Sequence, residues 1–272
     1  MTRIGALIVV VAVLAAIFGP VLVPDASTQI LALRLEGPTT AHWLGLDELG
    51  RDIFARVLAG ARISLVVGLA VVGVSATAGT LIGAIAGYFG GRVDEAISRV
   101  IDILMAFPGL LLAIALVAVL GPSLTNVLIA LSLIGWVAYA RLVRGQVLRA
   151  REFEYVQAAR ALGASTWRIL LLHIIPTALP AVTVQATLGM GGAILAEASL
   201  SFLGLGVQPP TPSWGTMLSG GRVHLLDAPH LTVFPGLAIA LLVLGFNFLG
   251  DGLRDLTDPK HQRAAASVAA QG

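Results

Sequence analysis

Hydrophobic residues fall into six long runs, which are separated by short polar segments. The runs cover residues 4–23, 63–89, 100–120, 124–140, 176–203 and 231–249. About 20 apolar residues are enough for a helix to cross the hydrocarbon core of a bilayer. The pattern therefore predicts an all-α polytopic membrane protein with six transmembrane helices and no room for a soluble catalytic domain.

The first run predicts a retained membrane anchor over residues 1–23. Arg3 precedes it, as in a signal peptide, but a signal peptide has an apolar core of only about 7–15 residues before a small-residue cleavage site. This run is longer, and Pro24 and Asp25 follow it. We expect an anchor whose N-terminus lies in the cytoplasm.

The next segment, residues 24–62, predicts an extracytoplasmic loop that carries an amphipathic helix. Asp47 is expected to cap a helix that begins at Glu48, because an aspartate at this position accepts backbone N–H groups. The apolar face of this helix would comprise Leu49, Ile53, Phe54, Val57 and Leu58. Two acid–base pairs have the four-residue spacing of helical ion pairs, namely Asp47–Arg51 and Asp52–Arg56. A surface helix without any special role is the alternative.

A polar stretch over residues 150–176 separates the fourth and fifth runs. Glu154 suits a helix N-terminus, which favours negative charge. Gly163 is expected to end that helix, since glycine adopts the left-handed conformation without strain. Ser165 is placed to cap a second helix that enters the membrane near Pro176. The stretch therefore predicts two short helices with a bend at Gly163.

Glycine recurs every four residues in the second run, at Gly79, Gly83 and Gly87. A stripe of small residues lets two helix backbones approach closely in lipid. We interpret these glycines as a helix-packing seam rather than a substrate site, and the sequence leaves open which helix lies against it.

The third run contains Pro108, which predicts a kink. Asp102 near its start is expected to form a local ion pair with Arg99 rather than a proton relay.

The fifth run is the most polar of the six, and it supplies three candidate pathway residues: Gln185, Gly189 and Glu197. Ionisable residues inside a membrane are often functional. Glu197, however, lies 17 positions beyond Pro180, which places it near the outer membrane edge. There it would be hydrated or paired with a loop arginine, so a structural role is slightly favoured.

Charge and composition narrow the function classes. The chain is 57% hydrophobic and 12% charged, and its net charge of +2 gives no basis for nucleic-acid binding. It contains no cysteine, which excludes disulfides and thiolate metal sites. With six spans and a cytoplasmic N-terminus, twelve of the 17 Lys and Arg residues fall on the cytoplasmic side. This bias agrees with the positive-inside rule and places both termini and residues 150–176 in the cytoplasm.

The polar stretch resembles a known motif. Gln157-Ala158-Ala159, Gly163 and Pro176 have the spacing of the "EAA…G…I-x-L-P" loop in permeases of binding-protein-dependent ABC importers. Three positions depart from that pattern: Gln157, His173 and Ile175. The resemblance implies the permease fold of that family, with this loop docked into a cytoplasmic ATPase. The implied coupling residues are Glu154, Gln157, Ala158, Ala159, Arg160, Gly163 and Ala164. A plain interfacial helix is the alternative.

Other segments resemble the dipeptide, oligopeptide and nickel branch of that family. These are residues 44–52, 60–64, 196–206 and 250–259, the last of which is similar to the tail of the shorter permease of the pair. The implied organisation is an anchor (1–23), an extracytoplasmic loop (24–62), a five-helix core (63–259) containing the coupling loop 150–176, and a cytoplasmic tail (260–272).

The resemblance implies a non-catalytic subunit in the plasma membrane of a prokaryote, forming half of a pathway for di- or oligopeptides. Its implied partners are the lipid bilayer, a homologous second permease, two ATPase subunits and an extracytoplasmic binding protein. The chain lacks the G-x-x-x-x-G-K-[ST] phosphate loop, so ATP and Mg²⁺ would be used by partner subunits, and we expect no cofactor or metal here.

Three alternatives remain. The same architecture would serve nickel, glutathione or another small solute. A stand-alone secondary transporter would need more intramembrane ionisable groups than Asp102 and Glu197. An intramembrane metalloenzyme would need a motif such as H-E-x-x-H, which is absent.

Overall fold

A computed structural model describes residues 1–23 and 25–257. Within these residues the protein is helical, and an isolated bridge between Leu46 and Asp52 is the only strand-like pairing. The α-helices are α1 (Thr2–Leu22), α2 (Ile53–Phe89), α3 (Gly91–Met105), α4 (Gly109–Leu120), α5 (Leu124–Ala150), α6 (Glu154–Ala161), α7 (Thr166–Ile169), α8 (Ile175–Phe202), α9 (Trp214–Gly221) and α10 (His230–Thr257). Two 3₁₀ turns, Leu31–Leu33 and Arg222–His224, and a π segment, Leu170–Ile174, complete the elements.

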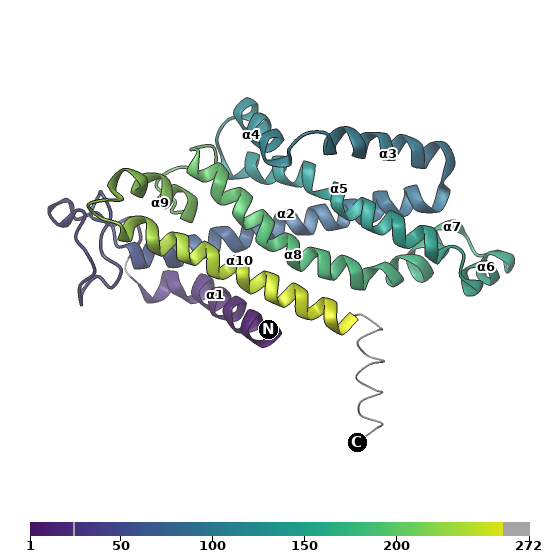
Figure 1. The fold of residues 1–272 in the computed structure, drawn as a ribbon, viewed down its shortest axis with the longest axis horizontal. Coiled ribbons are helices and arrows are strands. Elements are labelled where there is room, and N and C mark those ends of the chain that lie inside the picture. The colour runs from purple at the N-terminus through teal and green to yellow at the C-terminus, as the bar shows by residue number, and fades with distance from the viewer. Residues whose placement is uncertain (24, 258–272) are drawn as a thin grey trace, which may run out of the picture.

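The long helices form an elongated bundle (Figure 1). Helices α6 and α7 lie at one end, which we call the α6 end, and α9 lies with residues 25–52 at the other, the α9 end. Five helical stretches are long and apolar enough to cross a membrane, and they contain α1, α2, α5, α8 and α10. The remaining predicted span, residues 100–120, corresponds to the helix pair α3 and α4. This pair is bent by 85° around Pro108. The predicted all-α polytopic fold is therefore confirmed, with five candidate spans, or six if the bent pair forms one span.

The glycine stripe of α2 lies against α5 of the same chain. A Cβ atom added at Gly87 would lie 2.9 Å from the backbone oxygen of Arg144. Cβ atoms added at Gly79 and Gly83 would overlap the backbone oxygens of Trp136 and Ala140. Only glycine leaves room for the two backbones at these positions, so α2 and α5 form a closely packed seam.

The loop before α2 differs from the prediction. No helix begins at Glu48; α2 begins at Ile53, where Asp52 caps it by accepting the N–H of Ala55 at 3.0 Å. The carboxylate of Asp47 is used earlier, because it closes a turn by accepting the N–H groups of Leu49 and Arg51, both at 2.9 Å. The predicted amphipathic helix is therefore not a separate element. Its apolar positions from 53 onward belong to the first turns of α2.

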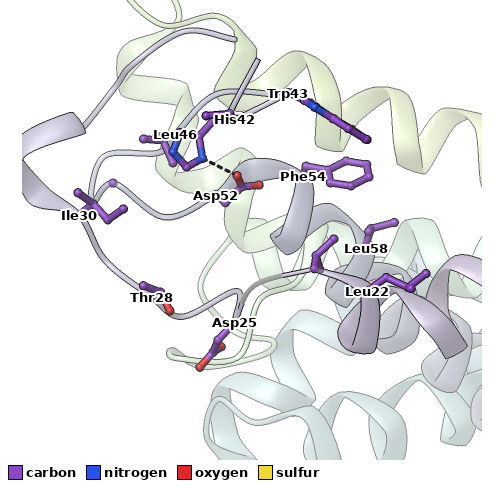
Figure 2. Close-up of a pocket in the computed structure, with 13 residues that line it drawn as sticks. Leu22, Asp25, Thr28, Ile30, His42, Trp43, Leu46, Asp52, Phe54 and Leu58 are labelled. Carbon is purple, nitrogen blue, oxygen red and sulfur yellow. Dashed lines mark hydrogen bonds and ion pairs between the residues drawn. The ribbon is translucent and has the colours of Figure 1, made fainter. Parts of the chain in front are cut away.

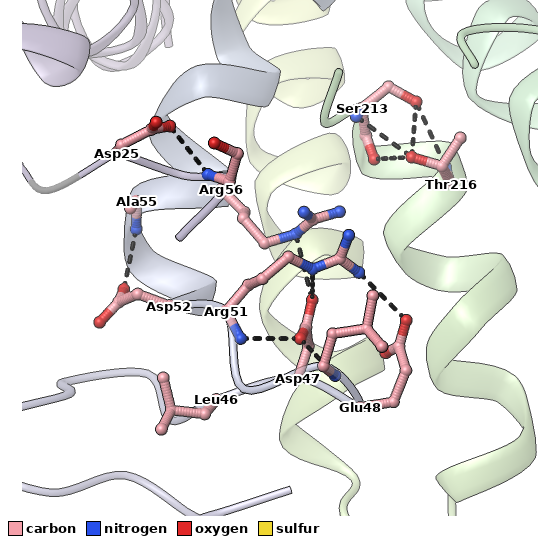
Figure 3. Close-up of polar contacts among 12 residues, drawn as sticks. Asp25, Leu46, Asp47, Glu48, Arg51, Asp52, Ala55, Arg56, Ser213 and Thr216 are labelled. Carbon is pink, nitrogen blue, oxygen red and sulfur yellow. Dashed lines mark hydrogen bonds and ion pairs between the residues drawn. The ribbon is translucent and has the colours of Figure 1, made fainter. Parts of the chain in front are cut away.

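Only one of the two predicted ion pairs in this loop forms. Arg51 Nε donates to Asp47 Oδ2 at 2.7 Å, as the spacing predicts. Asp52 instead pairs with His42 at 2.8 Å (Figure 2). Arg56 reaches Asp47 at 3.4 Å (Figure 3). The prediction failed because the Asp52 carboxylate is used by the N–H of Ala55 and by His42, while the guanidinium of Arg56 lies against Asp47.

Smaller differences concern helix lengths and one further pair. Residues 91–99, which precede the third apolar run, already belong to α3, and Arg99 pairs with Glu95 at 2.6 Å rather than with Asp102. Glu95 precedes Arg99 by four residues, the better-oriented spacing for a helical ion pair. Helix α5 continues to Ala150, and α10 reaches Thr257. The predicted tail over residues 260–272 and the last part of the predicted core lie outside the described residues.

Candidate functional site

The polar stretch at the α6 end folds as two short helices joined by a bend. Helix α6 ends at Ala161, and Gly163 follows with φ +79° in the left-handed region. The Ser165 hydroxyl then accepts the N–H of Arg168 at 3.4 Å and caps α7. We call residues 154–169 the knob.

The knob is anchored to the bundle by contacts from several elements. Val156 and Ile169 are fully or almost fully buried. The hydroxyl of Tyr155 donates to the backbone oxygen of His173 at 3.4 Å. The Arg160 guanidinium lies 5.4 Å from the ring centroid of Tyr88 at the end of α2. These contacts fix the orientation of the knob relative to α2 and to the π segment that leads into α8.

The predicted coupling residues divide between an outer and an inner face. Ala159 and Ala164 are half-buried and pack against the hydrophobic core of this chain. The exposed residues are Glu154, Gln157, Ala158, Arg160 and Gly163. Gln157 uses its side-chain amide locally, donating to the backbone oxygen of Glu152 at 3.2 Å. Ala159 is thus turned partly inward, and Ala158 is the alanine of the motif that faces outward.

Sequence reasoning missed the most exposed apolar residue of the knob. The side chain of Leu162 is 88% exposed at the bend. The signal in the sequence was the position of this leucine directly before the bend glycine Gly163. A side chain at a bend is not expected to pack into the core. An exposed leucine alone is common, but here it stands at the tip of an anchored projection.

Two of the three candidate pathway residues lie together, and the third is elsewhere. Gln185 and Gly189 line a cavity of about 250 Å³ between α2, α4, α5 and α8. Glu197 is not among the lining residues. It is 0% exposed, and its Oε1 accepts the hydroxyl of Ser201 at 2.7 Å.

The expectation that Glu197 is hydrated or paired with an arginine is therefore wrong. Ser201 Oγ also accepts the N–H of Val207 at 3.2 Å, so the carboxylate supports the turn after α8. Helix α9 closes over this point, since a Cβ on Gly215 would lie 2.7 Å from Ser201 Cβ. The sequence could not reveal this cover, because α9 packs there from a distant part of the chain.

The α9 end carries a second, larger pocket of about 580 Å³. Figure 2 shows Trp43, Phe54 and Leu58 along one side and the paired side chains of His42 and Asp52 beside them. Next to it, Asp47 and Arg56 are each 5% exposed, within a network that also contains Arg51 and Glu48 (Figure 3). These residues hold the loop against the start of α2.

Comparisons with known proteins agree with this architecture. Residues 79–263 match the family described as "Binding-protein-dependent transport system inner membrane component". The chain is 50% identical over 258 residues to the dipeptide transport system permease protein DppC of Alkalihalophilus pseudofirmus, covering 94% of this chain and 85% of the relative. It is 51% identical over 225 residues to the glutathione transport system permease protein GsiD of Pectobacterium atrosepticum, covering 83% and 75%. It is also 46% identical over 261 residues to a probable D,D-dipeptide transport system permease protein, DdpC, of Escherichia coli, covering 96% and 88%.

A solved structure shares the fold. A chain of the MetNI methionine ABC transporter in an inward-facing conformation aligns with a TM-score of 0.60 at 18% identity, covering 75% of this chain and 97% of that chain. The resemblance drawn from the loop motif is thus confirmed by sequence and by fold. The chain belongs to the family of inner membrane components of binding-protein-dependent transport systems.

Proposed function

We propose that this chain is one of two homologous permease subunits of an ATP-driven importer for di- or oligopeptides. Two relatives, 50% and 46% identical to this chain, are named for dipeptide transport. A third, 51% identical, is named for transport of glutathione, which is itself a peptide. The chain contributes half of the translocation pathway and no catalytic group. Two cytoplasmic ATPase subunits hydrolyse ATP with Mg²⁺, and an extracytoplasmic binding protein delivers the substrate.

The observation that carries the coupling role is the exposed tip of the anchored knob. Leu162 is 88% exposed, while Val156 behind it is 0% exposed. Burying one leucine side chain contributes about 1.5–3 kcal/mol, so an apolar cleft on a partner would gain from enclosing this tip. Because the knob is held against α2 and against the π segment that leads into α8, movement of the cleft would be passed to the spanning helices. This arrangement supports docking of an ATPase at the α6 end.

The distribution of arginine supports a cytoplasmic α6 end. Arg144, Arg149, Arg151, Arg160 and Arg168 all lie in or beside the knob. Clusters of this kind mark the cytoplasmic side of membrane proteins. Reporter fusions after Arg160 and after Ser219 test the orientation, and a cytoplasmic reporter at Ser219 would contradict it.

The coupling role is tested by Leu162→Asp in the reconstituted importer. We expect ATPase co-purification and peptide-driven ATP hydrolysis to fall at least tenfold, while membrane insertion is unchanged. The matched control is Leu226→Asp at the α9 end, where Leu226 is 98% exposed. ATPase retention equal to wild type in Leu162→Asp would reject the knob as the docking element.

Glutathione import is the second candidate, because the 51% identical relative is named for that substrate. Competition between labelled dipeptide and unlabelled glutathione, with the native binding protein present, separates the two. Displacement by glutathione at lower concentration than by dipeptide would favour the second candidate.

A further inference from the structure

Three arginines from one continuous segment converge on the turn between α2 and α3. We call this turn, residues 87–94, the corner, and it lies at the α6 end of the bundle (Figure 1). Arg144 lies near the end of α5, Arg151 follows that helix directly, and Arg160 belongs to the knob. The segment that leads into the knob is therefore also the segment that contacts the corner.

The first of these contacts is an ion pair between two helices. The guanidinium of Arg144 donates from Nε and from Nη2 to the two carboxylate oxygens of Asp94, and the Nη2–Oδ2 distance is 2.6 Å. The two residues are 50 positions apart, so the pair joins α3 to α5 rather than two turns of one helix. A bidentate arginine–carboxylate pair fixes the relative orientation of its two groups. The start of α3 is therefore held at a set position on α5.

The other two arginines contact the end of α2. Arg151 Nη1 donates to the backbone oxygen of Gly87 at 3.3 Å. The Arg160 guanidinium lies 5.4 Å from the ring centroid of Tyr88. The chain then reverses at Gly90, where φ is +63°, a conformation that glycine adopts without strain. Both sides of the corner, the end of α2 and the start of α3, are thus tied to the same segment.

Helix α3 connects the corner to the wall of the cavity between α2, α4, α5 and α8. Ile101 in α3 is 2% exposed and packs against α5. Helix α3 ends at Met105, and α4 begins at Gly109 after the 85° break. Gly109 lines the cavity of about 250 Å³. A displacement of the corner would therefore be carried along α3 to one wall of this cavity.

Folding stability alone is a weak reason for these contacts. Ion pairs that are open to solvent contribute little to stability. The pair Arg99–Glu95 is of this kind, because its side chains are 75% and 61% exposed and both residues belong to α3. In the pair Arg144–Asp94 the side chains are 35% and 18% exposed, and the pair links two helices. The three arginine contacts are thus better suited to keep the corner in register with the knob.

We propose that Asp94 and Arg144 are positioning residues, which pass movement of the knob to α3 and to the cavity wall. When a docked ATPase displaces the knob, the arginine contacts make the corner follow, and α3 moves together with α5. Both residues lie outside the knob, so the pair acts on transmission and not on docking. The inference rests on the proposed docking role of the knob, and it adds the route by which docking reaches the pathway.

The test uses the complete importer in proteoliposomes with peptide-loaded binding protein. Asp94→Asn keeps the size of the side chain and removes its charge. We expect peptide uptake per ATP hydrolysed to fall about tenfold, as for loss of a hydrogen bond to a charged group. ATPase co-purification and the midpoint of thermal unfolding should stay close to wild type.

Glu95→Gln is the matched control. It makes the same chemical change at the neighbouring position, but the pair that it breaks lies within α3 alone. This variant should keep the wild-type uptake per ATP. An equal fall in Asp94→Asn and Glu95→Gln would overturn the proposal, because it would indicate a general effect of charge on α3.

Exchange of the two residues tests whether the pair itself transmits the movement. Arg144→Asp places two carboxylates opposite each other, so it should lower uptake per ATP at least as much as Asp94→Asn. Combining Arg144→Asp with Asp94→Arg restores an ion pair between the same helices. We expect the double variant to recover most of the uptake per ATP. A double variant no better than Arg144→Asp alone would overturn the proposal.

The two proposals fail in different ways. Wild-type uptake per ATP in Asp94→Asn would overturn the transmission route alone. Loss of ATPase binding or of folding in Asp94→Asn would also overturn it, because the pair would then serve docking or stability. Retention of the ATPase in Leu162→Asp would instead overturn the docking role of the knob, whatever the result for Asp94.

Discussion

The polar segments at the two ends of the bundle differ in which side chains they bury and which they expose. At the α9 end, Asp47 is 5% exposed and holds Arg51 at 2.7 Å and Arg56 at 3.4 Å. At the α6 end, the most prominent side chain is Leu162, which is 88% exposed. One end buries charge within its own chain, and the other exposes an apolar tip on a fixed support.

This difference shows what each end requires from its surroundings. At the α9 end, Asp47, Glu48, Arg51 and Arg56 pair with one another, so this network is formed within the chain. The knob satisfies its backbone through caps and the Gly163 bend, yet it leaves apolar surface uncovered. In the proposed function, a second protein surface covers the tip of the knob, whereas the network around Asp47 is completed within the chain.

The largest effect is expected at the α9 end, for Asp47→Ala. The substitution leaves Arg56 buried without its partner and removes the acceptor for the N–H groups of Leu49 and Arg51. Breaking a buried ion pair costs about 3–5 kcal/mol. We expect a strongly lowered midpoint of thermal unfolding in detergent, measured by far-UV circular dichroism.

The control for this prediction is Asp25→Ala. Asp25 is an exposed carboxylate whose hydrogen bond runs to the N–H of Ser27 at 2.9 Å. Its removal should shift the midpoint very little, as is usual for surface substitutions. Equal midpoints for Asp47→Ala and wild type would break the comparison, because the buried network would then contribute nothing.

The sequence was sufficient to predict the spans and the knob, because both depend on local patterns. Runs of apolar residues, Gly163 at the bend and Ser165 at the cap each act within a few residues. The family motif added the coupling residues, although it could not distinguish Ala158 from Ala159, which differ only in the direction that each faces.

The remaining features depend on contacts between distant segments. Glu197 is covered by α9, and the glycine stripe meets α5, in each case through packing that no local pattern encodes. The prediction of a separate helix beginning at Glu48 failed for a related reason. Asp47 and Asp52 are both good caps, and the choice was decided by the turn that Asp47 closes and by the partner that His42 provides for Asp52.

A pair of neighbouring substitutions sharpens the comparison at the α6 end. Ala159→Asp places a carboxylate on the half-buried side of α6, and imperfect burial of a polar group costs about 1–3 kcal/mol. Ala158→Asp places it on the exposed side, where surface substitutions usually change stability by no more than about 0.5 kcal/mol. We expect Ala159→Asp to lower the unfolding midpoint, and Ala158→Asp to leave it unchanged while ATPase co-purification is lost.

Each variant is the control for the other, because the two substitutions differ by one position. Stability is read from thermal unfolding of the isolated permease, and docking from ATPase co-purification. If Ala158→Asp keeps the ATPase while Ala159→Asp loses it without any loss of stability, then the inward and outward faces assigned to α6 are wrong.

The smallest effect is expected for Gly163→Ala at the bend of the knob. Gly163 has φ +79°, and a Cβ added there would meet nothing within 4 Å, so the cost is conformational rather than steric. Placing an L-residue in the left-handed region costs roughly 1–2 kcal/mol.

The control is Gly145→Ala inside α5, where the added Cβ also meets nothing within 4 Å but no positive φ is present. That substitution should stabilise the helix by about 0.5–1 kcal/mol, because glycine is entropically unfavourable there. The two glycine-to-alanine changes are therefore expected to shift the unfolding midpoint in opposite directions. ATP hydrolysis driven by substrate-loaded binding protein should fall only in Gly163→Ala, since only that change alters the angle at which the tip is held. A fall of equal size in both variants would mean that the bend angle has no specific part in coupling.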